Sequence, residues 1–276
     1  MAIHIGCGSW TDDVYTGVLY PRGLPPAQRL ATYATWFDHI EVNSTYYAAP
    51  KEKVTASWAK QTPGGFKFQI KLHRAFSQNP QRAAEGDGVQ RLLRGVAPLI
   101  RENKLAAFLL VPSPSFTPDR HRLEELDALT KKLWPHPLAV ELRDCGWVQG
   151  KQKAQTLEYF RSHGLVWVAV DMPVIKGASL MPYVGEATRG DLAYVRLHGR
   201  NPRYTTAKSA AERHDYEYDA RALADVVAKL KKLSRKTGEL YVVANNHAHD
   251  FAPKTALALQ RALGLRARVK EAAKRA

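Results

Sequence analysis

The sequence predicts an α/β fold, a single-domain (β/α)8 TIM-like barrel. Eight apolar segments of strand length recur along the 276 residues, and each is rich in β-branched or aromatic residues. Segments with helical patterns separate most of them, and strands that alternate with helices pair in parallel through right-handed crossovers. Eight such units in about 250 residues match this barrel. An open doubly wound sheet is the alternative, but no GxGxxG motif follows the first segment.

The predicted strands are bounded by Gly, Pro, Asn or Asp, which interrupt extended structure. They are residues 3–8, 39–43, 66–72, 105–111, 138–143, 165–171, 192–198 and 240–246. No linker or low-complexity segment divides the chain. Residues 1–265 are therefore expected to form the barrel, and residues 266–276 form a basic C-terminal tail with five basic residues and one Glu.

Seven segments have the composition of helices. They are residues 25–37, 50–61, 88–103, 117–133, 151–164, 218–238 and 252–264. Thr117 is expected to cap its helix, with Pro118 at the first helical position. Pro98 predicts a kink or a break in its helix. Glycine is expected to stop three helices, at Gly164, Gly238 and Gly264. Residues 172–190 show only a weak helical pattern.

The formal net charge is +15 and the pI is about 9.8. Such a balance favours anionic partners, either nucleic acid or phosphorylated metabolites. No apolar run is long enough for a membrane helix, and the N-terminus lacks the pattern of a signal peptide. Cys7 and Cys145 form no CxxC or Cys/His pattern. A cytoplasmic protein with reduced thiols and no membrane partner is therefore expected.

Polar residues gather where the predicted strands end, which is the end of this barrel that carries active sites. Three pairs are spaced i, i+2 and so point to one face of a strand. These pairs are Glu41 with Asn43, Glu141 with Arg143, and Arg196 with His198. Their recurrence predicts a concave polar site in an otherwise apolar barrel.

The charges at this predicted site nearly cancel, and its arginines suit phosphate or carboxylate groups. The candidate catalytic acids and bases are Glu41, Glu141, Asp171 and His198. The candidate substrate-binding residues are Trp10, Asn43, Lys71, Arg143, Trp147, Arg196, Asn245 and Asn246. Nearby cations disfavour a tightly bound metal, although a single divalent cation on a carboxylate remains open. The sequence leaves any other cofactor unknown.

The segments "GCGSW", "GVLYP", "IEVNSTYY", "TPGGFKFQIK", "SPSF", "AVELRDCGW", "YVRLHG" and "NN…AP" resemble the DUF72 (YecE-like) family in order and spacing. The resemblance covers about residues 3 to 264. It implies a TIM-barrel-like fold and the same strand-end residues, but no activity. Three positions depart from the family's pattern, where Val111 replaces a Gln, Gln78 a His and His247 an Asp.

Three functions are compatible with these observations. The first is an enzyme, a hydrolase, lyase or isomerase, that acts on a phosphate- or carboxylate-bearing substrate by acid/base chemistry at the barrel mouth. The second is a nucleic-acid-binding or nucleic-acid-processing protein, which the net charge favours. The third is a non-catalytic ligand-binding barrel, which the departures at Val111 and Gln78 favour.

Overall fold

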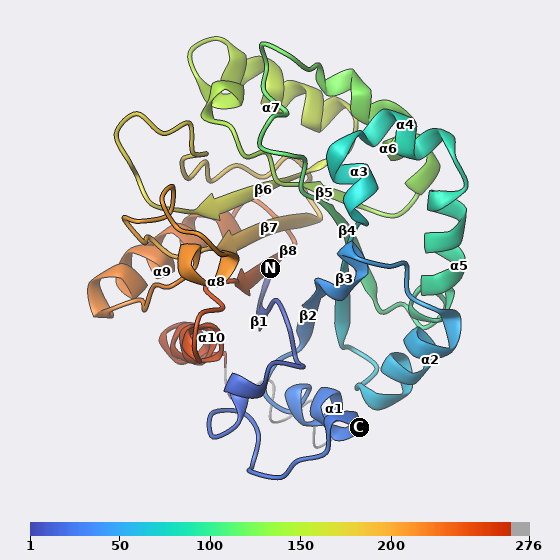
Figure 1. The fold of residues 1–276 in the computed structure, drawn as a ribbon, viewed down its shortest axis with the longest axis vertical. Coiled ribbons are helices and arrows are strands. Elements are labelled where there is room, and N and C mark those ends of the chain that lie inside the picture. The colour runs from blue at the N-terminus through green and yellow to red at the C-terminus, as the bar shows by residue number, and fades with distance from the viewer. Residues whose placement is uncertain (266–276) are drawn as a thin grey trace.

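The computed structural model describes residues 1–265 as eight parallel strands in a nearly closed barrel with helices around it (Figure 1). The strands are β1 (Ala2–Cys7), β2 (His39–Val42), β3 (Lys67–Lys71), β4 (Leu105–Leu110), β5 (Leu138–Val140), β6 (Val166–Asp171), β7 (Leu192–Leu197) and β8 (Glu239–Ala244). Each overlaps one predicted segment, so the prediction of eight strands in a TIM-like barrel is confirmed. The predicted basic tail lies outside the described residues.

The sheet runs in the order β1-β8-β7-β6-β5-β4-β3-β2. Within the described chain, no backbone ladder joins β1 to β2. The buried Tyr33 hydroxyl spans this seam, because it accepts a hydrogen bond from the Cys7 N–H (2.8 Å) and donates one to the His39 carbonyl (3.1 Å). A side chain thus replaces strand pairing where the barrel would otherwise stay open.

Helices cover the outside of the sheet (Figure 1). They are α1 (Arg29–Tyr33), α2 (Glu52–Gln61), α3 (Arg74–Gln78), α4 (Pro80–Glu85), α5 (Gly88–Arg101), α6 (Asp127–Leu133), α7 (Gln152–Ser162), α8 (Ala210–Arg213), α9 (Ala220–Ser234) and α10 (Phe251–Ala262). Residues 172–190 form no helix, in agreement with their weak pattern. None of the helices in residues 1–265 is both long and apolar enough to cross a membrane.

Three helix boundaries differ from the sequence predictions. Residues 118–120 form a turn, and the helix that Thr117 was expected to cap begins only with a 3-10 turn at Leu123–Leu126. There the Glu125 carboxylate accepts from the Arg122 N–H and takes over the capping role. Helix α5 continues through Pro98 without a break. Helix α9 ends at Ser234, four residues before the expected stop at Gly238.

Successive residues of each strand alternate between the barrel interior and the helix layer. Most residues of the outward set are apolar and buried, as with Phe68, Ile70 and Phe108. The interior set is unusually polar, with His39 bonded to Gln69 (2.9 Å) and to the Val242 carbonyl (3.2 Å). These interior groups fill the barrel beneath its mouth.

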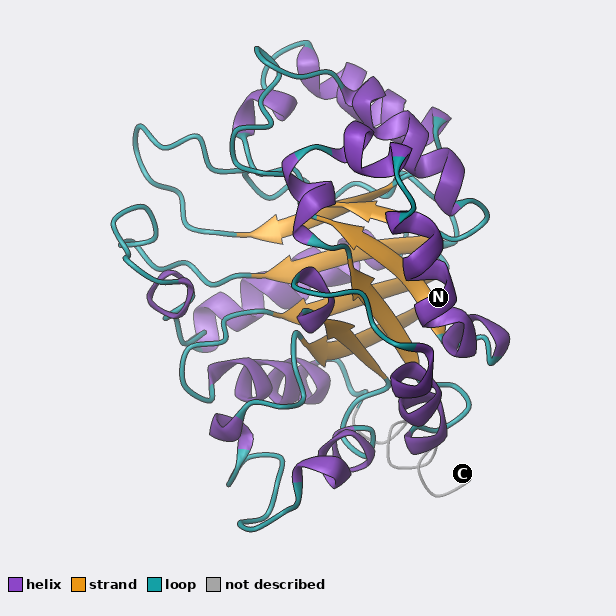
Figure 2. Cartoon of the chain, turned by 45° about the vertical axis from the view of Figure 1, so that its right-hand side comes forward, coloured by secondary structure: helices purple, strands orange, loops and turns teal. Residues whose placement is uncertain are grey.

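All strands point to the same side of the molecule, where long loops extend beyond the arrowheads (Figure 2). The register fixes which strand-end residues share the interior. Arg196 pairs with Val170 on one side and Val243 on the other, whereas Leu197 pairs with Asp171 and Ala244. Paired residues of a parallel sheet face the same way, so Arg196 lies inside and Asp171 outside.

Candidate functional site

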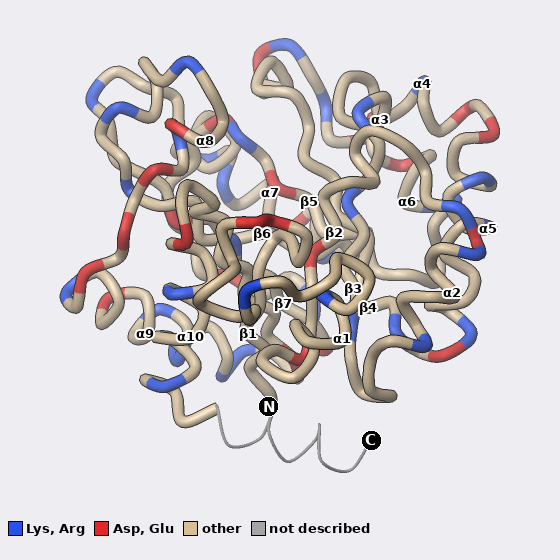
Figure 3. Tube along the Cα trace, turned by 60° about the horizontal axis from the view of Figure 1, so that its bottom comes forward, with Lys and Arg blue, Asp and Glu red and all other residues tan. Residues whose placement is uncertain are grey.

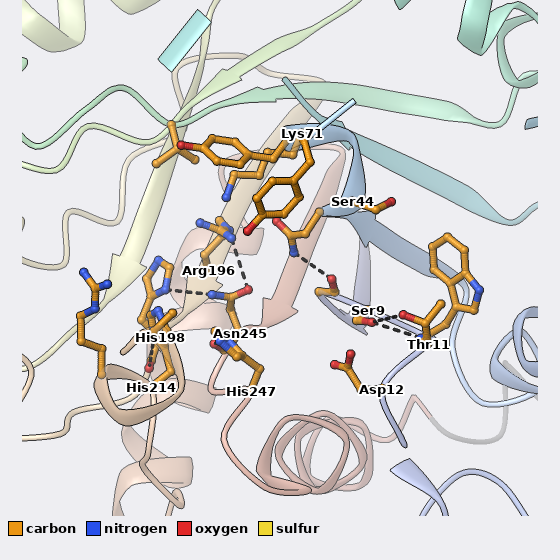
Figure 4. A pocket seen from close by; sticks show the side chains of 18 of the residues that line it. Ser9, Thr11, Asp12, Ser44, Lys71, Arg196, His198, His214, Asn245 and His247 are labelled. Atoms are coloured by element: carbon orange, nitrogen blue, oxygen red, sulfur yellow. Dashed lines mark hydrogen bonds between the residues drawn. The ribbon is translucent and has the colours of Figure 1, made fainter. Parts of the chain in front are cut away.

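A cavity of about 590 Å³ lies at the C-terminal ends of the strands. Figure 4 shows Lys71, Arg196, Asn245 and several histidines pointing into it. The polar and aromatic residues that line it include Trp10, Asp12, Asn43, Tyr46, Lys71, Arg143, Arg196, His198, Tyr204, Arg213, His214, Asn245 and His247. Its size suits a metabolite-sized ligand.

Arg196 lies at the floor of the cavity with 2% of its surface exposed. Its guanidinium donates to both carboxylate oxygens of Glu41 (2.8 and 2.9 Å) and to one oxygen of Glu141. Asn43 donates to the same Glu41 carboxylate at 3.0 Å, as the i, i+2 spacing predicted. This network fixes the guanidinium in one orientation.

Glu41 and Glu141 are buried below Arg196 and do not line the cavity. Burial alone would raise the pKa of each carboxyl, but Arg196 more than offsets it, so both pKa values lie below their ordinary value. Both groups are therefore ionised at neutral pH. Both carboxylates bind Arg196, and the catalytic role predicted for them stays a prediction.

His198 takes part in a hydrogen-bonded chain at the same depth. Its Nε2 lies 3.2 Å from Glu141, and its Nδ1 lies 3.1 Å from the Asn245 amide nitrogen. The Asn245 side-chain oxygen accepts a hydrogen bond from Arg196, so the Asn245 amide nitrogen is the group that faces His198. This nitrogen donates to Nδ1 of His198, and the His198 ring proton is therefore on Nε2. Burial lowers the pKa of His198 despite Glu141, so the ring is neutral. Both of its nitrogens are occupied.

Two further histidines have a ring nitrogen available to the cavity. His214 bonds through Nδ1 to the His198 carbonyl, and His247 bonds through Nδ1 to the Asn245 carbonyl, each at 3.0 Å. A carbonyl can only accept, so Nδ1 carries the proton and Nε2 keeps its lone pair. Burial, with the neighbouring His198, lowers the pKa of His214 to about 2, and burial lowers the pKa of His247. Both rings are therefore neutral, and His214, with the lower pKa, is the weaker base of the two.

The remaining charges of the cavity wall are mainly basic. Lys71, Arg143, Arg196 and Arg213 line the cavity with one carboxylate, that of Asp12, and Arg196 is already paired with Glu41 and Glu141 beneath it. Arg143 donates to the Tyr204 hydroxyl at 2.9 Å. An anion would satisfy the donors that these side chains leave free.

Three predicted site residues lie elsewhere. Asp171 faces the helix layer, where it accepts from Arg200 (2.7 and 2.8 Å) and Tyr218 (2.8 Å). Trp147 is buried and donates to the Phe116 carbonyl. Asn246 is fully buried and donates to the Tyr216 carbonyl and Thr255. These three side chains were predicted to lie at the barrel mouth, and none of them lines the cavity. Asp171 and Asn246 occupy strand positions whose side chains point outward from the barrel.

Sequence patterns did not predict that Tyr46, Tyr204, Arg213 and His214 line the cavity. The last three come from the long connection after β7, and their side chains reach the cavity only because that loop folds back over it. The run Arg213–His214 beside a predicted mouth was the available signal. Of the three departures, Val111 and His247 line the cavity, whereas Gln78 ends α3 at the surface.

Within residues 1–265, no group of three or more His, Cys, Asp or Glu side chains is placed to hold a metal ion. Cys7 and Cys145 are free thiols in this part of the chain.

Fold and site together define a (β/α)8 barrel protein with a basic, histidine-lined cavity at the C-terminal ends of its strands. The chain belongs to the DUF72 family, whose model, described as a protein of unknown function, matches residues 4–276. It is 25% identical over 255 residues to the UPF0759 protein YunF of Bacillus subtilis, with 89% of each chain covered.

Two crystal structures of DUF72 family proteins are similar to this chain. The protein from Thermotoga maritima is 31% identical, with a TM-score of 0.84 over 96% of this chain and 100% of that one. The protein from Enterococcus faecalis is 29% identical, with a TM-score of 0.84 over 95% of this chain and 96% of that one. The barrel architecture thus extends over nearly the whole length of all three chains.

Proposed function

We propose that the chain binds a small anion bearing phosphate or carboxylate in the cavity and acts on it by acid/base chemistry. The observation that carries this proposal is the fixed guanidinium of Arg196 at the cavity floor, with Arg143 and Lys71 beside it. Four of its five N–H groups donate to Glu41, Glu141 and Asn245, which fix its orientation and leave one N–H for a ligand. Preorganised donors of this kind bind anions without reorganisation.

The proton acceptor in this proposal is His247. Its ring is held by its Nδ1–H on the Asn245 carbonyl, so its Nε2 has a defined direction. A neutral imidazole can take a proton from a bound ligand and return it later in the cycle. Phosphate monoesters, 2-oxo acids and keto sugar phosphates are the substrate classes to screen for turnover.

Anion binding is tested by calorimetry with inorganic phosphate and with pyruvate. The Arg143→Met variant should bind about 10- to 100-fold more weakly, as expected for the loss of one charge-assisted interaction of about 1.5–3 kcal/mol. Arg91→Met is the matched control, because Arg91 lies on α5 in an exposed ion pair with Asp87 (3.0 Å) and should leave the affinity unchanged. If the unmodified chain bound neither inorganic phosphate nor pyruvate, the proposal would be refuted.

The catalytic part needs a separate experiment. His247→Gln should retain phosphate binding and lose turnover of any substrate that the screen identifies. Anion binding without turnover anywhere in the panel would instead favour the non-catalytic ligand-binding barrel.

A further inference from the structure

Lys71 is the last residue of β3 and lines the cavity close to Arg196 (Figure 4). In the described part of the chain, no carboxylate lies within ion-pair distance of its amine, which instead sits 4.9 Å from the centre of the Tyr46 ring. Lys67, four residues earlier on the same strand, donates its amine to the Asn103 carbonyl. The two lysines thus have opposite surroundings.

We propose that Lys71 is an amine nucleophile that forms an imine with a small anion carrying a ketone, such as a 2-oxo acid or a keto sugar phosphate. This inference rests on the proposed anion-binding function and names the substrate class of the same cavity. Arg196 and Arg143 would hold the carboxylate or phosphate, and this anchoring would bring the carbonyl carbon to the Lys71 amine.

The surroundings of Lys71 favour the neutral, nucleophilic form of its amine. Burial, and after it the charge of Arg196, lowers the pKa of Lys71 to about 8. At pH 7.5 roughly a quarter of the amine is then unprotonated, about two orders of magnitude more than for an ordinary lysine. Desolvation and a neighbouring cation are the two devices by which proteins activate lysine for this chemistry.

The step balances without an oxidant or reductant. The lone pair of Nζ forms a bond to the carbonyl carbon while the carbonyl π electrons move to oxygen. A cavity histidine relays a proton from nitrogen to that oxygen and gives a carbinolamine. Protonation of the hydroxyl releases water and leaves a protonated imine. His247 then removes a proton from the adjacent carbon, so the C–H electrons form the enamine double bond and the imine π electrons return to nitrogen. Return of this proton to carbon regenerates the protonated imine, and addition of water with loss of the amine restores Lys71 and releases the ketone.

The test is reductive trapping with pyruvate or dihydroxyacetone phosphate and sodium cyanoborohydride, followed by peptide mapping. We expect one saturable adduct on Lys71 with at least one ketone, and its rate should fall in excess inorganic phosphate. Lys67→Met should label like the unmodified chain, whereas Lys71→Met should lose the adduct. No adduct at Lys71 with either ketone, or labelling spread evenly over exposed lysines, would overturn the inference.

Two measurements keep the interpretation clear. Thermal unfolding of Lys71→Met establishes that the variant is folded. Phosphate calorimetry on the unmodified chain separates the two proposals, because binding without an adduct refutes only the imine, and the absence of both refutes the anion site as well.

Competitive acetylation provides a further readout that needs no substrate. Lys71 should titrate near pH 8, and titration of Lys71 at the pH of an ordinary lysine would also overturn the inference.

Discussion

Arg196 is the residue on which the site depends, because it holds two buried carboxylates in a barrel interior from which water is largely excluded. A buried ion network of this kind contributes little net stability, but removing one partner leaves uncompensated charge. The stability effect of Arg196 and its orientation toward the cavity therefore have the same origin.

Replacement of Arg196 by Met should lower the free energy of unfolding by about 3–5 kcal/mol at pH 8. In the unmodified chain the pKa values of Glu41 and Glu141 are below their ordinary value, so their contribution is present at neutral pH and is lost only as pH falls through the folded-state values. Without Arg196, burial raises both pKa values and folding takes up protons. The deficit should therefore shrink between pH 8 and pH 5.

Urea denaturation at several pH values measures this effect. Arg200→Met is the control, because Asp171 keeps Tyr218 and Lys229 as partners and the loss should be smaller. A deficit for Arg196→Met that does not change with pH would contradict the role assigned to the two carboxylates.

The sequence predicted this residue cluster in part. The i, i+2 spacing correctly placed Glu41 with Asn43 and Arg196 with His198, because alternation along a strand is a local property. The assignment of all strand-end polar residues to the mouth failed for Asp171 and Asn246. Alternation allows only one of the neighbours Asn245 and Asn246 to face inward, and which residues of a strand do so depends on the register across the sheet. That register is a tertiary property that one sequence does not reveal.

At the scale of elements, the seam between β1 and β2 is the feature that strand patterns did not predict. Tyr33, from α1, supplies one acceptor and one donor to backbone groups that face each other across the seam. Asn43 adds a second bridge by donating to the Gly8 carbonyl at 2.8 Å. The seam lies directly beneath the cavity wall, so its closure also positions Asn43.

Replacement of Tyr33 by Phe should lower the free energy of unfolding by about 1–3 kcal/mol, because the Cys7 N–H and the His39 carbonyl lose their partner inside the protein. Amide hydrogen exchange at Cys7 should accelerate in the same variant. Tyr241→Phe is the matched control, since its hydroxyl bonds to Glu239 on its own strand. Unchanged exchange at Cys7 would show that the seam is closed by other contacts.

Helix boundaries illustrate the limit of local signals at this scale. Gly164 and Gly264 have positive φ, 63° and 69°, and follow their helices as predicted. The Thr117–Pro118 start signal was overridden, because the chain between Thr117 and Leu123 forms a turn before the helical segment begins. Local capping preference amounts to about 1 kcal/mol, which tertiary packing easily exceeds.

At the scale of the whole molecule, the barrel was predictable because eight alternating units leave few other topologies. The loop that brings Tyr204, Arg213 and His214 over the cavity was not, since its path depends on contacts with the finished barrel. The net charge of +15 is likewise a global quantity. Figure 3 shows basic residues spread over helices around the barrel and interspersed with acidic ones.

This distribution separates two kinds of anion binding. Nucleic acid held by dispersed surface charge releases counterions, so its affinity should fall steeply with salt, whereas the charges of the cavity are partly buried and less screened. We expect a short DNA duplex to bind weakly and to lose at least about 100-fold in affinity between 50 and 200 mM salt.

Arg143→Met should leave binding of the duplex unchanged while it weakens binding of inorganic phosphate. Fluorescence anisotropy of a labelled duplex measures the first effect and calorimetry the second. If Arg143→Met abolished duplex binding as well, nucleic acid would have to enter the cavity, and a nucleic-acid-processing function would replace the small-anion proposal.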